Sequence, residues 1–504
     1  MDGDAWGVHH VTTIYVWYGR LLRFLHSCPD NSRAESTVAM ATRLPHRWML
    51  VLLLFQLRLL QPCLAATPPV ITTNAVTSLP GFSAPLPFSL ETGYVELDDD
   101  GIRFFYYFIQ SERSPADDPV LLWLTGGPGC SALSGLVYEV GPLAFDFHGY
   151  RGGLPTLLYR RDSWTQVSNI IFVDSPAGTG FTYDPTDNKL IPSDTIVVRQ
   201  LHTFLETWFD EHPMFLSNPL YIAGDSYSGM IIPSLTIEIA KGIESGDQRL
   251  CNLKGYIAGN PLTELARFDG NSKFPYLQRM GFIPDELYKV AFESCGGKYN
   301  SPLNALCAKS VQSIHNLIKD LNAMHILEPR CDTYPSLIIR KAASKDRRKR
   351  LLQSPVSSIC RNATYVLADL WANDEAVRES LGIRKGTVPS WRRHAHFPYI
   401  QDINSTVEYH LSLITKGYRA MVYSGDHDSE ISLIGTQAWI RYLNLSITDD
   451  WRPWYVDDQV AGYTTTYSGN LTYATVKGAG HTAPEYMPRE CLAMIDRWLS
   501  GEPL

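Results

Sequence analysis

Residues 218–233, NPLYIAGDSYSGMIIP, carry the strongest indication of the fold. The first half of this stretch is a short apolar run typical of a buried strand, and its second half continues in a pattern that favours a helix. Ser226 lies at the junction, where small neighbours leave room for a sharp, strained turn. A serine in this place forms a nucleophile elbow, here a variant of G-x-S-x-G in which Ser228 precedes Gly229. Taken alone, the stretch also fits a simple strand-to-helix turn.

The order of apolar runs along the chain predicts an α/β architecture. Short continuous apolar runs are typical of parallel strands that are buried on both faces. Such runs occupy residues 169–174, 219–224, 253–259, 418–424 and 471–476. The stretches 174–219 and 226–252 are long enough for crossover helices. We therefore expect a central, mixed but mostly parallel sheet flanked by helices.

The sheet is expected to begin with antiparallel strands. The runs 93–97, 102–109 and 120–124 are separated by two short segments rich in Asp, Pro, Gly and Ser. Such segments are turn signals, and turns between consecutive strands indicate antiparallel neighbours.

An inserted cap interrupts the alternation of strands and helices from about residue 265 to 400. This span contains four cysteines and no run that resembles a central strand. Within it, residues 340–350 are strongly basic and poor in apolar side chains, which indicates an exposed loop. Exposed basic loops are also favoured sites of proteolytic nicking, so a solvated loop and a processed linker both stay open.

The N-terminal segment resembles a targeting sequence. Residues 49–60 form an apolar run that is too short to span a bilayer, and small residues follow at a spacing that suits signal peptidase. We expect a signal peptide over residues 40–65 and a gene-model extension over residues 1–39; a buried core helix is the alternative. The domain then covers residues 66–504.

Composition narrows the classes of function. The chain has 45% hydrophobic and 19% charged residues and a net charge of −8, which are typical of a globular protein and exclude a strongly basic nucleic-acid binder. The cysteines and histidines lack zinc-site spacing, so we expect no metal and no cofactor. Four N-glycosylation sequons indicate the secretory pathway: Asn362, Asn404, Asn444 and Asn470.

An acid and a histidine follow Ser226 in the order that a catalytic triad on this architecture requires. Asp428 comes after the run 418–424, and His481 comes after the run 471–476, both on glycine-containing loops. Because a serine hydroxyl is weakly acidic, we expect His481 to take its proton and Asp428 to orient the imidazole. Asp426 competes with Asp428 for this role, although Asp428 has the more usual spacing.

A glycine-rich turn is the candidate oxyanion hole. It directly follows the run 120–124 and begins Thr125-Gly126-Gly127. We expect the backbone N–H of Gly127, together with that of Tyr227, to stabilise a developing oxyanion. A tight turn without a catalytic role is the alternative for the motif alone.

Taken together, these motifs resemble those of one family, the serine carboxypeptidase-like proteins, and within it the plant branch. The resemblance covers residues from about 78 to 504 and implies the α/β-hydrolase fold. The blocks that carry it are GGPGCSALSGLVYEVGPL (126–143), VDSPAGTGFTY (173–183), NPLYIAGDSYSGMIIP (218–233), KGYIAGNPLT (254–263), YSGDHDSEISLIGTQAWI (423–440) and GHTAPEYMP (480–488).

Two positions depart from the peptidases of that family. Where those enzymes bind the substrate carboxylate with Asn and Glu, this chain has Thr125 and Asp225. Together with Gly126, these are the expected substrate-binding residues. The exchange weakens a carboxylate clamp, because Thr has no amide donor and Asp is one methylene shorter. The same pair is similar to the acyltransferase branch, which uses 1-O-β-glucose esters.

The resemblance therefore implies an enzyme that acts through an acyl-Ser226, with an acyl donor and an acceptor as small-molecule partners. The alternatives are a serine carboxypeptidase that acts on peptide C-termini, and a secreted glycoprotein that only binds. We expect neither nucleic acid nor a membrane anchor, and we expect a vacuolar or extracellular location.

The family also implies two disulfides and a two-chain form in some relatives. The implied pairs are Cys130–Cys360 and Cys295–Cys307. Three cysteines have no assigned partner: Cys251, Cys331 and Cys491. Cleavage of a linker at 340–350 would give the two-chain form.

Overall fold

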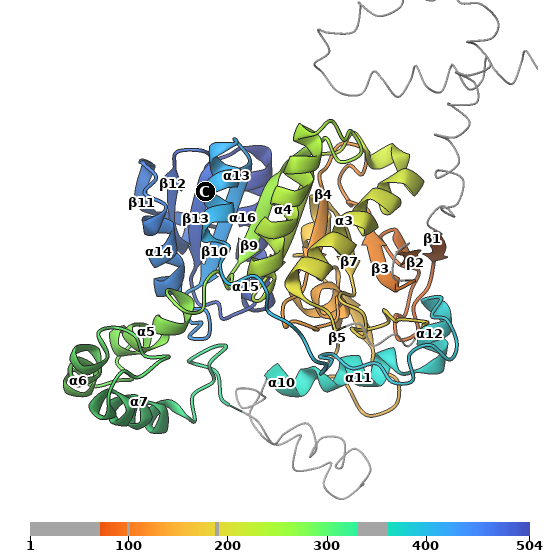
Figure 1. Ribbon diagram of the computed structural model, residues 1–504. Coiled ribbons are helices and arrows are strands. Elements are labelled where there is room, and N and C mark those ends of the chain that lie inside the picture. Colours follow the sequence, from red (N-terminus) through yellow and green to blue (C-terminus); the bar gives the residue numbers. More distant parts are fainter. Residues whose placement is uncertain (1–70, 98–100, 187–190, 331–360) are drawn as a thin grey trace, which may run out of the picture.

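The computed structural model describes residues 71–97, 101–186, 191–330 and 361–504 (Figure 1). The predicted extension 1–39, the predicted signal peptide 40–65 and the basic stretch 340–350 lie outside these residues, as do Cys331 and Cys360. Among the helices described, none is long and apolar enough to cross a membrane.

The centre of the molecule is a mixed β-sheet. Within the described residues it has 11 strands in the order β1-β2-β3-β7-β4-β8-β9-β10-β13-β12-β11. The neighbours from β7 to β13 in this order are parallel, and the flanking pairs are antiparallel. The strands are β1 (Ile71–Val76), β2 (Leu90–Glu96), β3 (Arg103–Ile109), β4 (Val120–Leu124), β7 (Asn169–Val173), β8 (Leu220–Asp225), β9 (Leu253–Gly259), β10 (Arg419–Gly425), β11 (Ile447–Val456), β12 (Gln459–Tyr467) and β13 (Leu471–Val476). A separate pair consists of β5 (Leu143–Phe145) and β6 (Leu157–Tyr159).

The expected antiparallel start is right for β2 and β3 but wrong for β4. Strand β7 lies between β3 and β4, and β4 pairs with β7 in parallel. The reason is burial on both faces: Leu121 and Trp123 enter one core, whereas Leu122 and Leu124 enter the other. An interior place among parallel neighbours suits such a strand.

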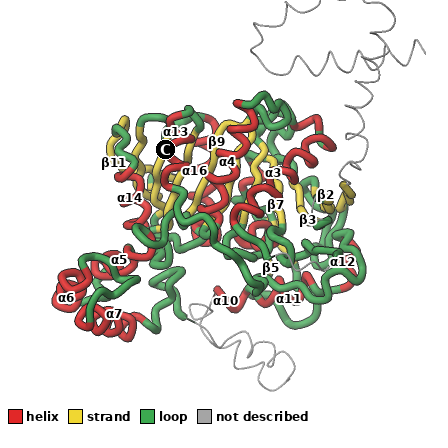
Figure 2. The backbone as a smooth tube through the Cα atoms, in the orientation of Figure 1, coloured by secondary structure: helices red, strands yellow, loops and turns green. Residues whose placement is uncertain are grey.

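Helices cover both faces of the sheet, as Figures 1 and 2 show. Apolar side chains of four helices pack on one face: α3 (Asp194–Glu211), α4 (Ser228–Glu244), α13 (Val407–Thr415) and α14 (Leu433–Tyr442). Those of four others pack on the opposite face: α11 (Val366–Ala372), α12 (Glu375–Ser380), α15 (Ala483–Tyr486) and α16 (Pro488–Ser500). The layers are those of the predicted α/β-hydrolase fold.

The region 265–400 contributes helices and, within its described part, no strand of the sheet. Three of its helices share a small core of their own: α5 (Lys273–Arg279), α6 (Asp285–Cys295) and α7 (Ala305–Ile318). They lie beyond the lower edge of the sheet in Figure 1, as do α10 (Arg361–Thr364) and α11. Short helical turns complete the fold: η1 (Gly135–Glu139), η2 (Trp164–Gln166), η3 (Pro213–Phe215) and η4 (Asp269–Asn271).

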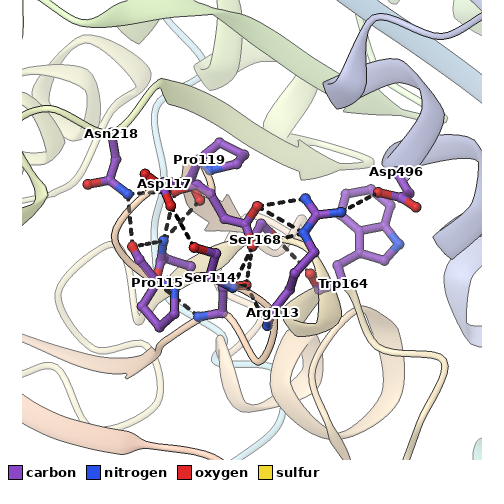
Figure 3. A network of polar contacts seen from close by, with 12 residues as sticks. Arg113, Ser114, Pro115, Asp117, Pro119, Trp164, Ser168, Asn218 and Asp496 are labelled. Carbon is purple, nitrogen blue, oxygen red and sulfur yellow. Dashed lines mark hydrogen bonds and ion pairs between the residues drawn. The ribbon is translucent and has the colours of Figure 1, made fainter.

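A polar network fixes the amino ends of β4 and β8 (Figure 3). Arg113 binds Asp118 at 2.6 Å and reaches Asp496 of α16 at 3.0 Å. The Nδ2 atom of Asn218 donates to the carbonyls of Pro115 (2.9 Å) and Asp118 (2.7 Å). The network therefore joins the turn before β4 to the start of β8 and to α16, at the ends of the strands opposite Ser226.

Candidate active site

Ser226 occupies the sharp turn between β8 and α4, as predicted. Its φ of 57° lies in the left-handed region, which is strained for a residue with a side chain. The turn is tight: a Cβ on Gly229 would lie 2.4 Å from the carbonyl oxygen of Leu262, and one on Gly126 would lie 2.5 Å from Cβ of Ser226. Only glycine allows these approaches, so the local sequence determines where Ser226 points.

The structure joins Ser226, His481 and Asp428 in one chain of hydrogen bonds. Nε2 of His481 lies 2.7 Å from Oγ of Ser226, and Nδ1 lies 2.7 Å from Oδ2 of Asp428. Asp426, the competing acid, instead binds Nδ1 of His427 at 2.5 Å and the N–H of Gly478 at 2.7 Å. The geometry therefore selects Asp428 as the partner of His481.

Asp428 is held by backbone donors. It is fully buried and accepts backbone N–H groups of Glu430 (2.7 Å) and Ile431 (3.2 Å). Burial opposes protonation of His481, but the charge of Asp428 and its hydrogen bond outweigh burial and raise the pKa of His481 above its ordinary value. The imidazolium that forms when Ser226 loses its proton is thereby stabilised.

Asn260 is a site residue that the sequence reasoning missed. It is fully buried, and its Nδ2 atom donates to Oδ2 of Asp428 at 2.8 Å. Its Oδ1 atom accepts the N–H of Gly425 at 3.0 Å, and its φ is 39°. A polar residue directly after the buried run 253–259 was the available signal, since that run ends at the same edge of the sheet as the strands before Ser226 and Asp428.

The predicted substrate-binding residues Thr125 and Asp225 lie near the buried carboxyl group of Glu139. Oδ1 of Asp225 accepts the N–H of Gly126 at 3.3 Å. Oε2 of Glu139 accepts Nε1–H of Trp123 at 2.9 Å and the hydroxyl of Thr125 at 3.4 Å. Burial raises the pKa of Asp225 to about 6, and burial with the charge of Asp225 raises the pKa of Glu139 well above its usual range.

Glu139 is a second site residue that was not predicted from the sequence. It stands alone in the apolar run 136–140, and an acidic residue that is 1% exposed there needs partners. Arg393 supplies positive charge to this cluster: it is held over the ring of Tyr365 at 3.8 Å, and its charge favours the ionised form of Glu139.

The expected oxyanion hole lies next to Ser226. Tyr227 directly follows Ser226, and a Cβ added to Gly126 would lie 2.5 Å from Cβ of Ser226. Gly127 has a φ of 126°, which favours glycine. The role of the two N–H groups stays a prediction.

Comparisons with known proteins agree with this geometry. Residues 80–501 match the profile of the serine carboxypeptidase family. The chain belongs to that family. Serine carboxypeptidase-like 9 of Arabidopsis thaliana is 46% identical over 435 residues, which cover 86% of this chain and 95% of the relative. Serine carboxypeptidase-like 11 of the same plant is 45% identical over 436 residues, with the same two coverages.

A solved structure supports the fold. A prohormone-processing carboxypeptidase from Saccharomyces cerevisiae aligns with a TM-score of 0.67 at 20% identity, over 85% of this chain and 95% of that one. The predicted resemblance, the α/β-hydrolase fold and the assignment as an enzyme of the serine carboxypeptidase family are thus confirmed.

One of the two implied disulfides lies within the described residues. Cys295 and Cys307 form a disulfide that joins the end of α6 to α7, as expected. Cys360 lies outside the described residues, so the bond between Cys130 and Cys360 stays a prediction. Cys491 is a buried free thiol.

Three of the four sequon asparagines are exposed: Asn404, Asn444 and Asn470. Asn362 lies in α10, but its side chain is outside the described part. In that described part we also find no cluster of three or more His, Cys, Asp or Glu side chains arranged to hold a metal ion.

Proposed function

We propose that this protein is an acyltransferase that moves an acyl group from a 1-O-β-glucose ester to a metabolite hydroxyl or amine. Oγ of Ser226 attacks the ester carbonyl while His481 takes the hydroxyl proton, and the N–H groups of Gly127 and Tyr227 hold the oxyanion. The bond to glucose breaks as His481 returns the proton to the leaving oxygen. The acceptor then attacks acyl-Ser226, its proton passes to His481, and the Ser226 oxygen takes the proton back.

The proposal rests on the hydrogen bonds that Thr125 and Asp225 make within the protein. The hydroxyl of Thr125 donates to Glu139, and Oδ1 of Asp225 accepts the N–H of Gly126, whereas the buried Oδ2 of Asp225 has no hydrogen-bond partner among the described residues. No amide donor stands at position 125 to meet a substrate carboxylate. Binding therefore depends less on a free C-terminus, and a neutral ester without one becomes the better donor.

One observation favours the alternative, a serine carboxypeptidase. The buried carboxyl groups of Glu139 and Asp225 have raised pKa values, so they are protonated at acid pH. A protonated carboxyl group donates a hydrogen bond, and two such groups would accept a peptide carboxylate between them. A peptidase of this kind would lose activity as the pH rises through these pKa values.

An assay of both reactions separates the two functions. The purified protein is given a mixture of glucose esters and hydroxyl acceptors, and separately a blocked dipeptide. We expect transfer products to form faster than C-terminal amino acids are released. Rapid release of amino acids at acid pH without any transfer product would contradict the acyltransferase.

Variants at the two deciding positions sharpen the assay. The double variant Thr125→Asn with Asp225→Glu restores the peptidase residues and should raise the ratio of peptide cleavage to transfer. Thr125→Ser is the matched control, because it keeps a hydroxyl that can donate to Glu139, and its ratio should stay that of the wild type. An unchanged ratio in the double variant would show that these positions do not set the reaction.

We also infer that the protein enters the secretory pathway, towards the vacuole or the outside of the cell, and that its partners are a small-molecule donor and acceptor. The Cys295–Cys307 disulfide and the exposed sequons support the first inference. The two-chain form after cleavage at 340–350 stays a prediction. Mobility on a denaturing gel, before and after reduction and removal of N-glycans, tests passage through the secretory pathway and the two-chain form.

A further inference from the structure

A short segment of the cap binds both loops that carry the acid and the base. We call residues 323–326 the clamp. The carbonyl oxygen of Met324 accepts the backbone N–H of His481 at 2.8 Å. The carbonyl of Ala323 accepts the backbone N–H of Ser429, the residue after Asp428, at 2.9 Å. One segment of the insertion therefore binds the backbone of His481 and the backbone of the residue after Asp428.

The clamp also contacts the Asp428 loop through His325 and Ile326. The N–H of Ile326 donates to the carbonyl of His427 at 3.0 Å. The imidazole of His325 is buried and stacks on His427, with 5.2 Å between ring centroids and 15° between planes. The ring also packs on Tyr486, with 4.9 Å between ring centroids. Packing against two aromatic rings holds the imidazole in one orientation.

Both ring nitrogens of His325 are engaged. Nδ1 lies 3.3 Å from the backbone N–H of Leu327, and Nε2 lies 3.1 Å from the carbonyl oxygen of Gly478. An amide N–H only donates and a carbonyl only accepts, so both bonds form only in the neutral tautomer with its proton on Nε2. Gly478 lies in the turn that leads from β13 to His481, three residues before His481.

The backbone of the His481 loop lies directly against the clamp. A Cβ added to Gly480 would lie 2.4 Å from the carbonyl oxygen of Met324 and 2.9 Å from Cβ of His325. The His481 loop therefore cannot move closer to the clamp. A change in the clamp displaces Gly480, the residue next to His481.

We propose that His325 is a positioning residue for His481. By donating from Nε2 to the carbonyl of Gly478, it sets the path of the His481 loop and so keeps Nε2 of His481 2.7 Å from Oγ of Ser226. His325 acts through this loop and not on the substrate. The inference rests on Ser226 being the nucleophile of the proposed function, but not on which acceptor takes the acyl group.

Two amide substitutions separate the bonds of His325. The amide nitrogen of Gln reaches about as far as Nε2 of an imidazole, so His325→Gln keeps a donor to Gly478. The shorter amide of Asn ends near the position of Nδ1, so His325→Asn keeps a partner for Leu327 and loses the bond to Gly478. Both replace the ring with an amide, so each is the other's control for the loss of stacking.

The readout is the rate at which a fluorophosphonate labels Ser226, together with kcat and KM for a chromogenic ester. A displacement of the base costs activity steeply, so His325→Asn should lose about 10- to 100-fold in labelling rate and in kcat. Its KM should stay within about twofold of the wild type, because ground-state binding is not changed. His325→Gln should keep most of the activity, and His315→Asn, on an exposed cap residue of α7, should keep all of it.

Two results would overturn the inference. The first is a His325→Asn protein that labels as fast as the wild type. The second is an equal loss in the Asn and Gln variants that follows their unfolding temperatures, since that pattern belongs to a purely structural residue. If His325→Asn does not fold, His325→Ala, which also lacks the donor, takes its place against His325→Gln. Wild-type protein that is not labelled at Ser226 would instead refute the proposed function.

Discussion

Replacing Asn260 tests how the Asp428 carboxylate is held. The change Asn260→Ala removes the bond to the charged Asp428 (2.8 Å) and the bond to the N–H of Gly425 (3.0 Å). The first is worth about 1.5–3 kcal/mol and the second about 1 kcal/mol in the free energy of unfolding. Because the backbone φ at this position is 39°, Ala adds strain of about 1 kcal/mol that Gly does not have. We therefore expect Asn260→Ala to lower stability by about 3.5–5 kcal/mol, and Asn260→Gly by about 1 kcal/mol less.

Activity should respond differently from stability in these two variants. Both lose the same bond to Asp428, and loss of about 1.5–3 kcal/mol from an interaction that orients the triad lowers kcat by roughly 10- to 100-fold. Urea unfolding gives the stabilities, and fluorophosphonate labelling of Ser226 gives the activity of the triad. Equal loss of labelling with unequal loss of stability is the expected result. Labelling of Asn260→Gly at the wild-type rate would refute the role given to Asn260.

Two further predictions concern the triad itself. Asp428→Asn removes the charge that raises the pKa of His481, so the acid limb of the pH–rate profile, where protonation of His481 stops catalysis, should move to lower pH. Its maximal rate should fall by on the order of 10³- to 10⁴-fold; an unmoved limb would mean that another group titrates. Gly126→Ala should abolish labelling of Ser226 while the protein stays folded by circular dichroism, because the new Cβ would lie 2.5 Å from Cβ of the nucleophile. Labelling at the normal rate would contradict the close approach.

The places of Ser226, Asp428 and His481 in the fold could be predicted from the sequence because each lies in the turn or loop after a buried strand. Ser226, Asp428 and His481 come after β8, β10 and β13, whose carboxyl ends meet at one edge of the sheet. Local patterns therefore sufficed both to find the strands and to place the loops after them.

Other site residues depend on contacts that no local pattern records. Glu139 lies on a helical turn in an apolar run and reaches Thr125 only through the packing of that turn on β4. His325 belongs to the cap, and nothing in its neighbourhood in the sequence connects it to His481. Their roles follow from tertiary contacts, which fold-level patterns do not encode.

The order of strands in the sheet also could not be predicted from local sequence patterns. The runs that became β3 and β4 were found, but the insertion of β7 between them is a property of the topology and not of either run. The hairpin of β11 and β12 was missed because exposed polar and aromatic residues alternate irregularly along β11, so it lacks the continuous apolar pattern of the buried strands.

Acyl transfer through Ser226 can be tested by trapping the acyl group on the protein. The enzyme is mixed with a 1-O-β-glucose ester, quenched in acid within one turnover, digested, and analysed by mass spectrometry. We expect the acyl mass on the peptide that contains Ser226, and we expect a hydroxyl acceptor, more than water, to remove it. Formation of the transfer product without any adduct on Ser226, or an adduct that only water removes, would contradict acyl transfer through Ser226.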